Sequence, residues 1–121
     1  MDMNERLVGG VIVLDLNGKL TIEDGVQFLK DKIQSLVQQE RKQLVLNLGG
    51  VPYIDSGGLG VLVAGYATIT KAGGRLTLIN VNKKDHDLLS ITRLVTIFET
   101  FDSEPEALAS YPAATVGQGD I

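Results

Sequence analysis

The sequence predicts an α/β fold: a single domain with a mixed, mostly parallel β-sheet of about four to five strands and about four helices packed mainly on one face. Three observations lead to this prediction. The chain has 121 residues, the length of one domain, and 44% of them are apolar, which is enough for a buried core. Between residues 11 and 79, strand-like and helix-like patterns alternate, and this order favours parallel strands joined by right-handed crossovers.

The first part of the chain is expected to form a β-hairpin. Residues 11–16 are a β-branched, apolar run typical of a strand. Gly9-Gly10 before it is typical of a turn, so residues 3–8 are expected to pair with this strand in antiparallel fashion.

A first helix is predicted after the hairpin. From Ile22 to Leu36, apolar residues recur at alternating spacings of four and three, which places them on one helix face. Thr21 is expected to be the N-cap, with Asp24 completing a capping box. The helix is expected to end near Glu40.

Two further core strands and a second helix are predicted in the middle of the chain. Residues 44–48 and 76–79 have the apolar pattern of strands. Between them, apolar residues from Leu59 to Ile69 fall on one helix face, and Gly73-Gly74 ends that helix.

A third helix and an edge strand are expected next. Asn82 is a candidate N-cap for a helix that runs to about Thr92, and residues 96–100 are predicted to form a short edge strand. Polar residues also interrupt the core strands, which indicates that one face of the sheet is covered less completely than the other. They are Asp15, Asn47 and Thr77.

The end of the domain is predicted from a capping box and a change of composition. Ser103 and Glu106, with Pro105 in the first turn, are typical of the start of a short helix. Residues 111–121 have linker composition, so we expect the domain to span residues 1–110 and the tail to be disordered.

Composition excludes several classes of protein. Zero cysteines and one histidine exclude a disulfide scaffold and a zinc–thiolate site, and we expect neither a metal nor a cofactor. The net charge is 11 − 15 = −4 without a block of basic residues, so we expect no nucleic acid and no membrane as partners. The N-terminus shows no signal-peptide pattern, so we expect a cytoplasmic protein.

Three loops are expected to meet at one edge of the sheet, because the carboxyl ends of parallel strands gather there. The middle loop places Ser56 at a helix start that contains three glycines, each costing up to about 1 kcal/mol relative to alanine inside a helix. We expect close approach of another backbone to offset this cost, and unpaired N–H groups to serve as donors for a phosphate on Ser56. The loops are residues 17–21, 49–60 and 80–84.

The same loop has plainer interpretations. Ser56 or Asp55 can be only an N-cap. Neither glycine-rich nucleotide fingerprint is met, and Ile54 stands where a hydrolase nucleophile elbow needs glycine. His86, the sole candidate base, lies in a charged stretch typical of a solvated surface. Lys83-Lys84 is typical of an exposed helix start and is also a candidate charge partner for a phosphate.

Residues 53–62, Tyr-Ile-Asp-Ser-Gly-Gly-Leu-Gly-Val-Leu, closely resemble the signature of STAS domains, specifically the bacterial anti-sigma factor antagonists (anti-anti-sigma factors). Residues 16–21 resemble the segment that leads into the first helix of this family, and residues 45–48 resemble its central strand. Together with the order of elements, the resemblance covers about residues 4–110.

The resemblance implies a protein–protein switch and not an enzyme. In the family, the unmodified antagonist binds an anti-sigma factor that is also a serine kinase, and the sigma factor is released. The kinase then phosphorylates the serine that matches Ser56, the antagonist dissociates, and a PP2C-type phosphatase resets it. Asp55 matches the acidic residue before the phosphorylation site. The other implied partner-binding residues are Gly57, Gly58, Leu59, Gly60 and Thr21.

Two positions depart from the family pattern. Gly57 stands where many members have Ser or Thr, and Thr21 stands where the family often has Asp. A phosphate adds about −1.5 to −2 charges, and beside Asp55 this charge is expected to weaken a bound partner roughly a hundredfold to a thousandfold with little backbone change. The alternatives are a STAS module that binds a small anion, nucleotide or lipid, and a structural subunit of a larger signalling assembly.

Overall fold

The computed structural model describes residues 1–112 and contains one five-stranded sheet in the order β1-β2-β3-β4-β5. β1 is antiparallel to β2, and β2 to β5 are parallel to one another. The mixed, mostly parallel sheet predicted from the sequence is therefore confirmed. The strands are β1 (Asp2–Val8), β2 (Val11–Asn17), β3 (Gln43–Gly50), β4 (Arg75–Ile79) and β5 (Glu99–Phe101).

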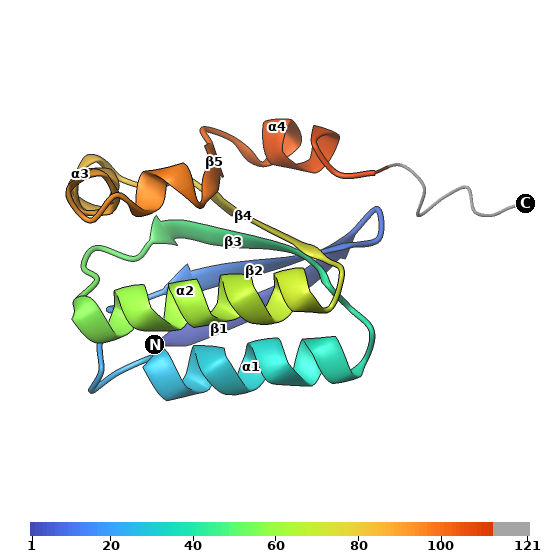
Figure 1. Ribbon diagram of the computed structural model, residues 1–121, viewed down its shortest axis with the longest axis horizontal. Coiled ribbons are helices and arrows are strands. Elements are labelled where there is room, and N and C mark those ends of the chain that lie inside the picture. Colours follow the sequence, from blue (N-terminus) through green and yellow to red (C-terminus); the bar gives the residue numbers. More distant parts are fainter. Residues whose placement is uncertain (113–121) are drawn as a thin grey trace, which may run out of the picture.

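Helices cover both faces of this sheet, but unequally (Figure 1). α1 and α2 lie side by side on one face, and their apolar residues form the larger core cluster with the inward side chains of β2, β3 and β4. Leu89 of α3 joins this cluster, whereas α4 covers the opposite face with a smaller one. The helices are α1 (Val26–Gln38), α2 (Ser56–Lys71), α3 (Lys83–Ile91) and α4 (Glu104–Ala109), with a 3-10 turn, η1 (Leu94–Thr96).

The polar residues of the core strands have partners on the less covered face. Asp15 and Asn47 are register partners in β2 and β3, and the Asn47 amide donates to the Asp15 carboxylate at 2.8 Å. Arg6 of β1 donates to Asp15 at 2.7 and 2.9 Å and to Glu104 of α4 at 2.7 and 3.2 Å. This cluster joins four elements at the surface and gives Asp15 and Asn47 hydrogen-bond partners.

The start of the first helix was predicted wrongly. α1 begins at Val26 and not at Ile22, because Thr21 and Asp24 exchange backbone hydrogen bonds of 2.7 and 3.0 Å that close a turn. Gly25, with φ of 94°, then redirects the chain into the helix, a conformation that glycine adopts without a Cβ clash. Thr21 is therefore not the N-cap, and Ile22 is 74% exposed instead of packed in the helix face.

The predicted domain ends at residue 110, which assigns Tyr111 to the tail, but the structure buries this residue in the domain. This side chain is only 7% exposed, and its hydroxyl hydrogen-bonds to Thr77 Oγ1 at 2.9 Å and donates to the carbonyl of Leu44. Tyr111 is thus part of the core, because its ring fills the space between α4 and the sheet. The rest of the predicted tail, residues 113–121, lies outside the described residues.

The elements near the C-terminal end agree with the prediction except for one strand. Asn82 caps α3 by accepting from the Asp85 N–H at 2.7 Å, and Ser103 caps α4. The edge strand expected at 96–100 is instead the three-residue β5, because η1 precedes it and Phe98 turns into the larger core at 3% exposure. No helix within residues 1–112 is long and apolar enough to cross a membrane.

Candidate functional site

Three loops meet at the carboxyl edge of the parallel strands, as the sequence predicted. The loop after β2 joins the loop after β3 through two backbone bonds, from the Leu20 N–H to the Tyr53 carbonyl at 3.0 Å and from the Asp55 N–H to the Leu20 carbonyl at 3.2 Å. The side chain of Asn82 reaches the carbonyl of Val51 at 3.2 Å from the loop after β4. The start of α2 is therefore held from both sides.

Asp55 is the N-cap of α2 and links it to the loop after β2. One carboxylate oxygen accepts the Gly58 N–H at 2.8 Å, and the other accepts the Ile22 N–H at 3.1 Å. These backbone donors, the Gly58 N–H foremost, hold the pKa of Asp55 below its usual value. The Gly58 N–H is thus already occupied, so the expectation that the helix start offers unpaired donors to a phosphate is wrong for this group.

Ser56 is the first residue of α2, directly after the cap. Its side chain is exposed, and its hydroxyl makes no hydrogen bond to any residue between 1 and 112. Since no internal partner fixes this oxygen, it is available to an external protein or enzyme.

The three glycines after Ser56 differ in whether the surrounding structure leaves space for a side chain. A Cβ on Gly58 would lie 2.2 Å from the Leu20 carbonyl oxygen, and one on Gly57 would lie 2.9 Å from Cβ of Ile22. Both positions therefore permit the close approach of the loop after β2, which was the expected compensation for a glycine-rich helix start. Gly60 has open space around it, so the fold does not demand glycine there.

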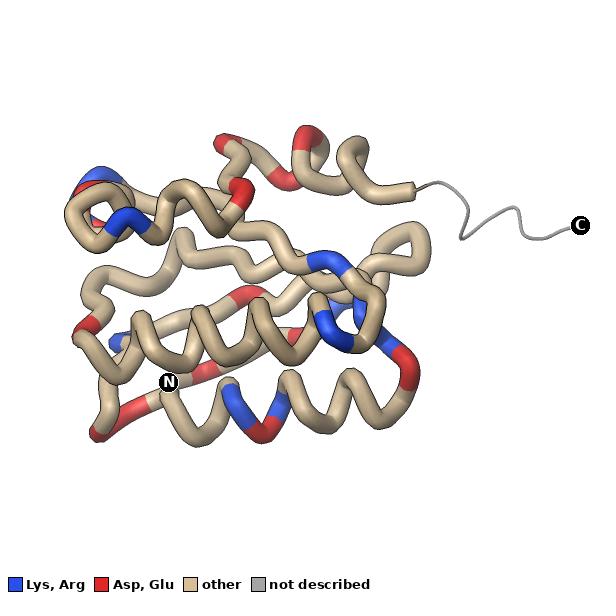
Figure 2. The backbone as a smooth tube through the Cα atoms, in the orientation of Figure 1, with Lys and Arg blue, Asp and Glu red and all other residues tan. Residues whose placement is uncertain are grey.

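A groove of about 620 Å³ lies between the start of α2 and one face of α3, with Ser56 among its lining residues. Most of its other walls are apolar, and two of them are exposed: Tyr53 at 41% and Ile91 at 79%. α2 has no charged residue before Lys71, which is visible as the long uncoloured helix in Figure 2. Such an exposed apolar surface is typical of a protein-binding site.

The α3 side of this groove was missed from the sequence. Leu88 and Ile91, three positions apart, line it together with Leu59 of α2. The sequence does contain one signal for it: Leu88 and Ile91 form an apolar pair on the helix after Asn82, in addition to the apolar residues of the predicted core strands. This pair lies opposite Ser56 only because of the relative placement of α2 and α3. The spacing of apolar residues within one helix does not predict that placement.

The charged side chains in and beside the groove differ in burial and in their partners. Asp85 is 1% exposed, its Oδ2 has no hydrogen-bond partner among the described residues, and burial raises its pKa. Lys84 places its ammonium 5.0 Å from the ring centroid of Tyr53, whereas Lys83 pairs with Asp87 at 3.0 Å. The expected base candidate, His86, is exposed and does not line the groove.

Thr21 lies beside the site but outside the groove. Its hydroxyl accepts the Asp24 N–H at 3.1 Å, so it stabilises the turn before α1. The next residue, Ile22, donates its N–H to Asp55 and lies under Gly57. Thr21 is thus connected to the start of α2 through Ile22. Its own side chain makes no hydrogen bond to Asp55 or Ser56.

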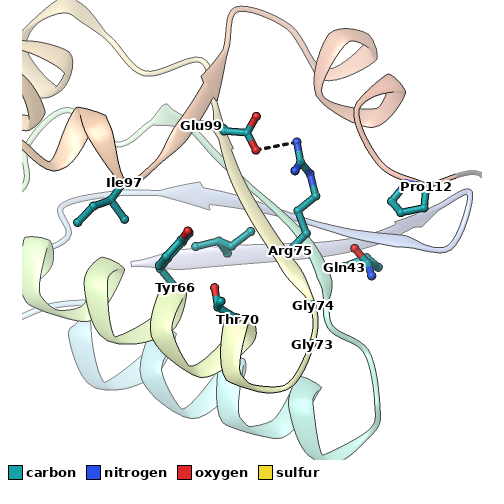
Figure 3. A pocket seen from close by; sticks show the side chains of 10 residues that line it. Gln43, Tyr66, Thr70, Gly73, Gly74, Arg75, Ile97, Glu99 and Pro112 are labelled. Atoms are coloured by element: carbon teal, nitrogen blue, oxygen red, sulfur yellow. Dashed lines mark ion pairs between the residues drawn. The ribbon is translucent and has the colours of Figure 1, made fainter.

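A second hollow, of about 370 Å³, lies at the opposite edge of the sheet (Figure 3). It is lined by the first residues of β3, β4 and β5, namely Gln43, Arg75 and Glu99. Arg75 and Glu99 form an ion pair of 2.8 Å, so their charges largely compensate each other. Within residues 1–112, no group of three metal-ligating side chains is present at either edge.

Comparison with known proteins agrees with this architecture. The sequence pattern of the STAS domain matches residues 3–107, which is most of the chain. The chain belongs to the STAS domain family. Among its relatives is the anti-sigma F factor antagonist of Paenibacillus polymyxa, which is 29% identical over 99 residues, covering 82% of this chain and 85% of that protein.

Solved structures of STAS proteins share the fold. The crystal structure of a candidate anti-sigma factor antagonist from Thermotoga maritima is 31% identical, covers 88% of this chain and 92% of that one, and has a TM-score of 0.83. The phosphorylated form of SpoIIAA, a Bacillus cell fate determinant, is 19% identical with a TM-score of 0.70, covering 89% and 97% of the two chains. The latter likeness concerns the fold alone.

Proposed function

We propose that this STAS protein is an anti-sigma factor antagonist whose binding is switched off by phosphorylation of Ser56. The unmodified protein binds an anti-sigma factor with serine kinase activity, and the sigma factor held by that protein is released. The observation that carries the proposal is the exposed Ser56 hydroxyl, without an internal partner, at the edge of an apolar groove. The names of the relatives support the class of partner.

The partner docks on the groove and on the start of α2. Tyr53, Leu59 and Ile91 supply apolar contact area, and Ile22 extends it on the other side of Gly57. Gly60, with open space around it, lets a partner backbone approach the helix. Asp55, Gly57, Gly58 and Thr21 act through the shape of this surface, since they hold the loop after β2 against the helix.

The kinase reaction changes the charge at the centre of this surface. The γ-phosphoryl group of ATP is transferred to Ser56 Oγ: the new O–P bond forms as the phosphoanhydride bond breaks, the hydroxyl proton leaves, and ADP is released. The product adds about −1.5 to −2 charges beside Asp55, whose low pKa keeps it ionised. A docked partner would bury these charges, which weakens binding roughly a hundredfold to a thousandfold.

The switch is local and needs no refolding of the domain. Asp55 continues to cap α2 through the Gly58 N–H, and the loop after β2 stays attached to both. A PP2C-type phosphatase then hydrolyses the phosphate ester with water and restores the hydroxyl.

The test is phosphorylation by the anti-sigma factor kinases of the same cell. We expect a single phosphate on Ser56 by mass spectrometry, lost in Ser56→Ala and retained in Ser90→Ala, which removes an exposed serine of α3. Calorimetry with the same kinase should show at least a hundredfold weaker binding of the phosphorylated protein. Modification at another residue, or equal binding of both forms, would contradict the proposal. Saturable binding of a nucleotide, anion or lipid without phosphoryl transfer would favour a ligand-binding module instead.

A further inference from the structure

Lys84 is the one basic side chain among the residues that line the groove in the described part of the chain. Its ammonium lies 5.0 Å from the centroid of the Tyr53 ring and forms no ion pair within residues 1–112. The neighbouring Lys83 differs, because Asp87 holds it at 3.0 Å. Lys84 thus forms no ion pair with a described carboxylate, although its charge acts on Asp85 of the same groove at longer range.

A phosphate on Ser56 would need a counter-charge that the start of α2 does not supply. The Gly58 N–H is occupied by the Asp55 carboxylate, which itself adds a like charge. α2 carries no basic residue until Lys71 at its far end, as Figure 2 shows. The helix dipole favours an anion at the start of α2, but the Asp55 carboxylate is already an anion at this position and partly compensates the dipole.

We propose that Lys84 is the counter-ion of phosphorylated Ser56, a role that rests on the proposed function. On phosphorylation the ammonium leaves the face of Tyr53 and binds the phosphate oxygens. A charge-assisted hydrogen bond to a dianion is stronger than an exposed contact with an aromatic ring, and the flexible lysine stem allows the move. Because both side chains line the same groove, we expect this move without a change in the backbone.

The new ion pair joins α3 to the start of α2 across the groove. Lys84 is the second residue of α3, and Ser56 is the first residue of α2, so their contact spans the two walls. A partner that needs the groove is then excluded by the bridging side chain as well as by the added charge. This accounts for release while the domain itself tolerates the phosphate.

The test measures the second ionisation of the phosphate in protein with phosphoserine installed at position 56 during translation. A nearby ammonium favours the dianion, so Lys84→Gln should raise this pKa in a ³¹P NMR titration by about 0.3 to 0.7 unit. The matched control, Lys83→Gln, removes the same charge one residue away and should raise the pKa by clearly less, because that ammonium is paired with Asp87 and Lys83 does not line the groove. Asp55, Asp85 and His86 keep their neighbours in the control. Asp87 loses its lysine partner there, so any rise in the control is an upper limit for the removal of a charge at this distance.

A second measurement follows the lysine itself. In the unmodified protein, the Lys84 Cε protons should carry a ring-current shift from Tyr53, and phosphorylation should remove it. Equal pKa changes in the two lysine variants, no change in either, or an unaltered Lys84 signal would overturn the proposal. Since the phosphate is installed without a kinase, this result is independent of whether a kinase modifies Ser56. Lys84 is exposed, so its replacement leaves the core intact.

Discussion

Asp55 and Asp85 are two carboxylates of one groove whose surroundings act in opposite directions. Asp55 accepts two backbone N–H groups, which lower its pKa and keep it charged at the start of α2. Asp85 is buried at the first turn of α3, and one of its oxygens has no hydrogen-bond partner within residues 1–112. The first carboxylate therefore stabilises local structure, whereas the second costs stability when it is ionised.

Replacing Asp85 with asparagine should stabilise the protein near neutral pH. Burial raises the pKa of Asp85 in the folded state, so the folded protein binds this proton more tightly than the unfolded chain does. The stability linked to this group is thus present at low pH and is lost as pH rises through the raised pKa. We expect Asp85→Asn to increase the midpoint of thermal unfolding by a few degrees at pH 7, and by less near pH 4.

The control for this prediction is Asp87→Asn, which removes an exposed carboxylate paired with Lys83 and should change the midpoint little at either pH. If Asp85→Asn unfolds at a lower temperature than the unchanged protein at pH 7, the carboxylate has a stabilising partner and this account of Asp85 is incorrect.

At the scale of elements, the starts of α1 and α2 differed in how far sequence could predict them. α2 was located because Asp55-Ser56 is a strong capping pair and the glycines mark a close approach. α1 was extended too far, because Ile22 continues the apolar spacing although the Asp24 carbonyl accepts the Thr21 N–H and closes a turn. The spacing of apolar residues does not show that the hydrogen bond of a turn already occupies a carbonyl that a helix would need.

A pair of glycine substitutions in α2 tests the close approach of the loop after β2. In Gly58→Ala the new methyl would lie 2.2 Å from the Leu20 carbonyl oxygen, so the loop and the helix must separate. We expect the free energy of unfolding to fall by about 1–3 kcal/mol. Gly60→Ala meets no atom within 4 Å and should raise it by up to about 1 kcal/mol through helix propensity.

Denaturant unfolding of both variants measures these changes. Since both replacements are glycine to alanine in the same helix, their difference reports the close contacts of Gly58 with the Leu20 carbonyl and the Ile54 side chain. Equal effects of the two substitutions would mean that the loop does not pack against Gly58.

For the whole molecule, the sequence was sufficient for the sheet and for the edge that carries the candidate site. The alternation of strands and helices predicted parallel pairing, and parallel pairing brings the three loops together. The groove was not predictable in the same way, since it arises where α2 and α3 face each other. Tyr111 was missed because linker-like residues follow it, although its own ring fills the core under α4.

Tyr111→Phe tests whether the domain extends past residue 110. The substitution keeps the ring but removes a hydroxyl that bonds to Thr77 Oγ1 and to the Leu44 carbonyl, both buried in neighbouring strands. We expect the free energy of unfolding to fall by about 1–3 kcal/mol, because these groups lose their partner. Tyr53→Phe, on an exposed ring, should change it little.

The ionisation of the tyrosines gives an independent readout of the same packing. Burial, the largest cause, raises the pKa of Tyr111 to about 12. An absorbance titration should therefore show one tyrosine ionising near pH 12, provided that the protein stays folded, and this step should be absent in Tyr111→Phe. A protein in which Tyr111→Phe loses no stability and the high-pH step persists would place Tyr111 outside the core. The domain would then end before residue 111, as its sequence alone suggested.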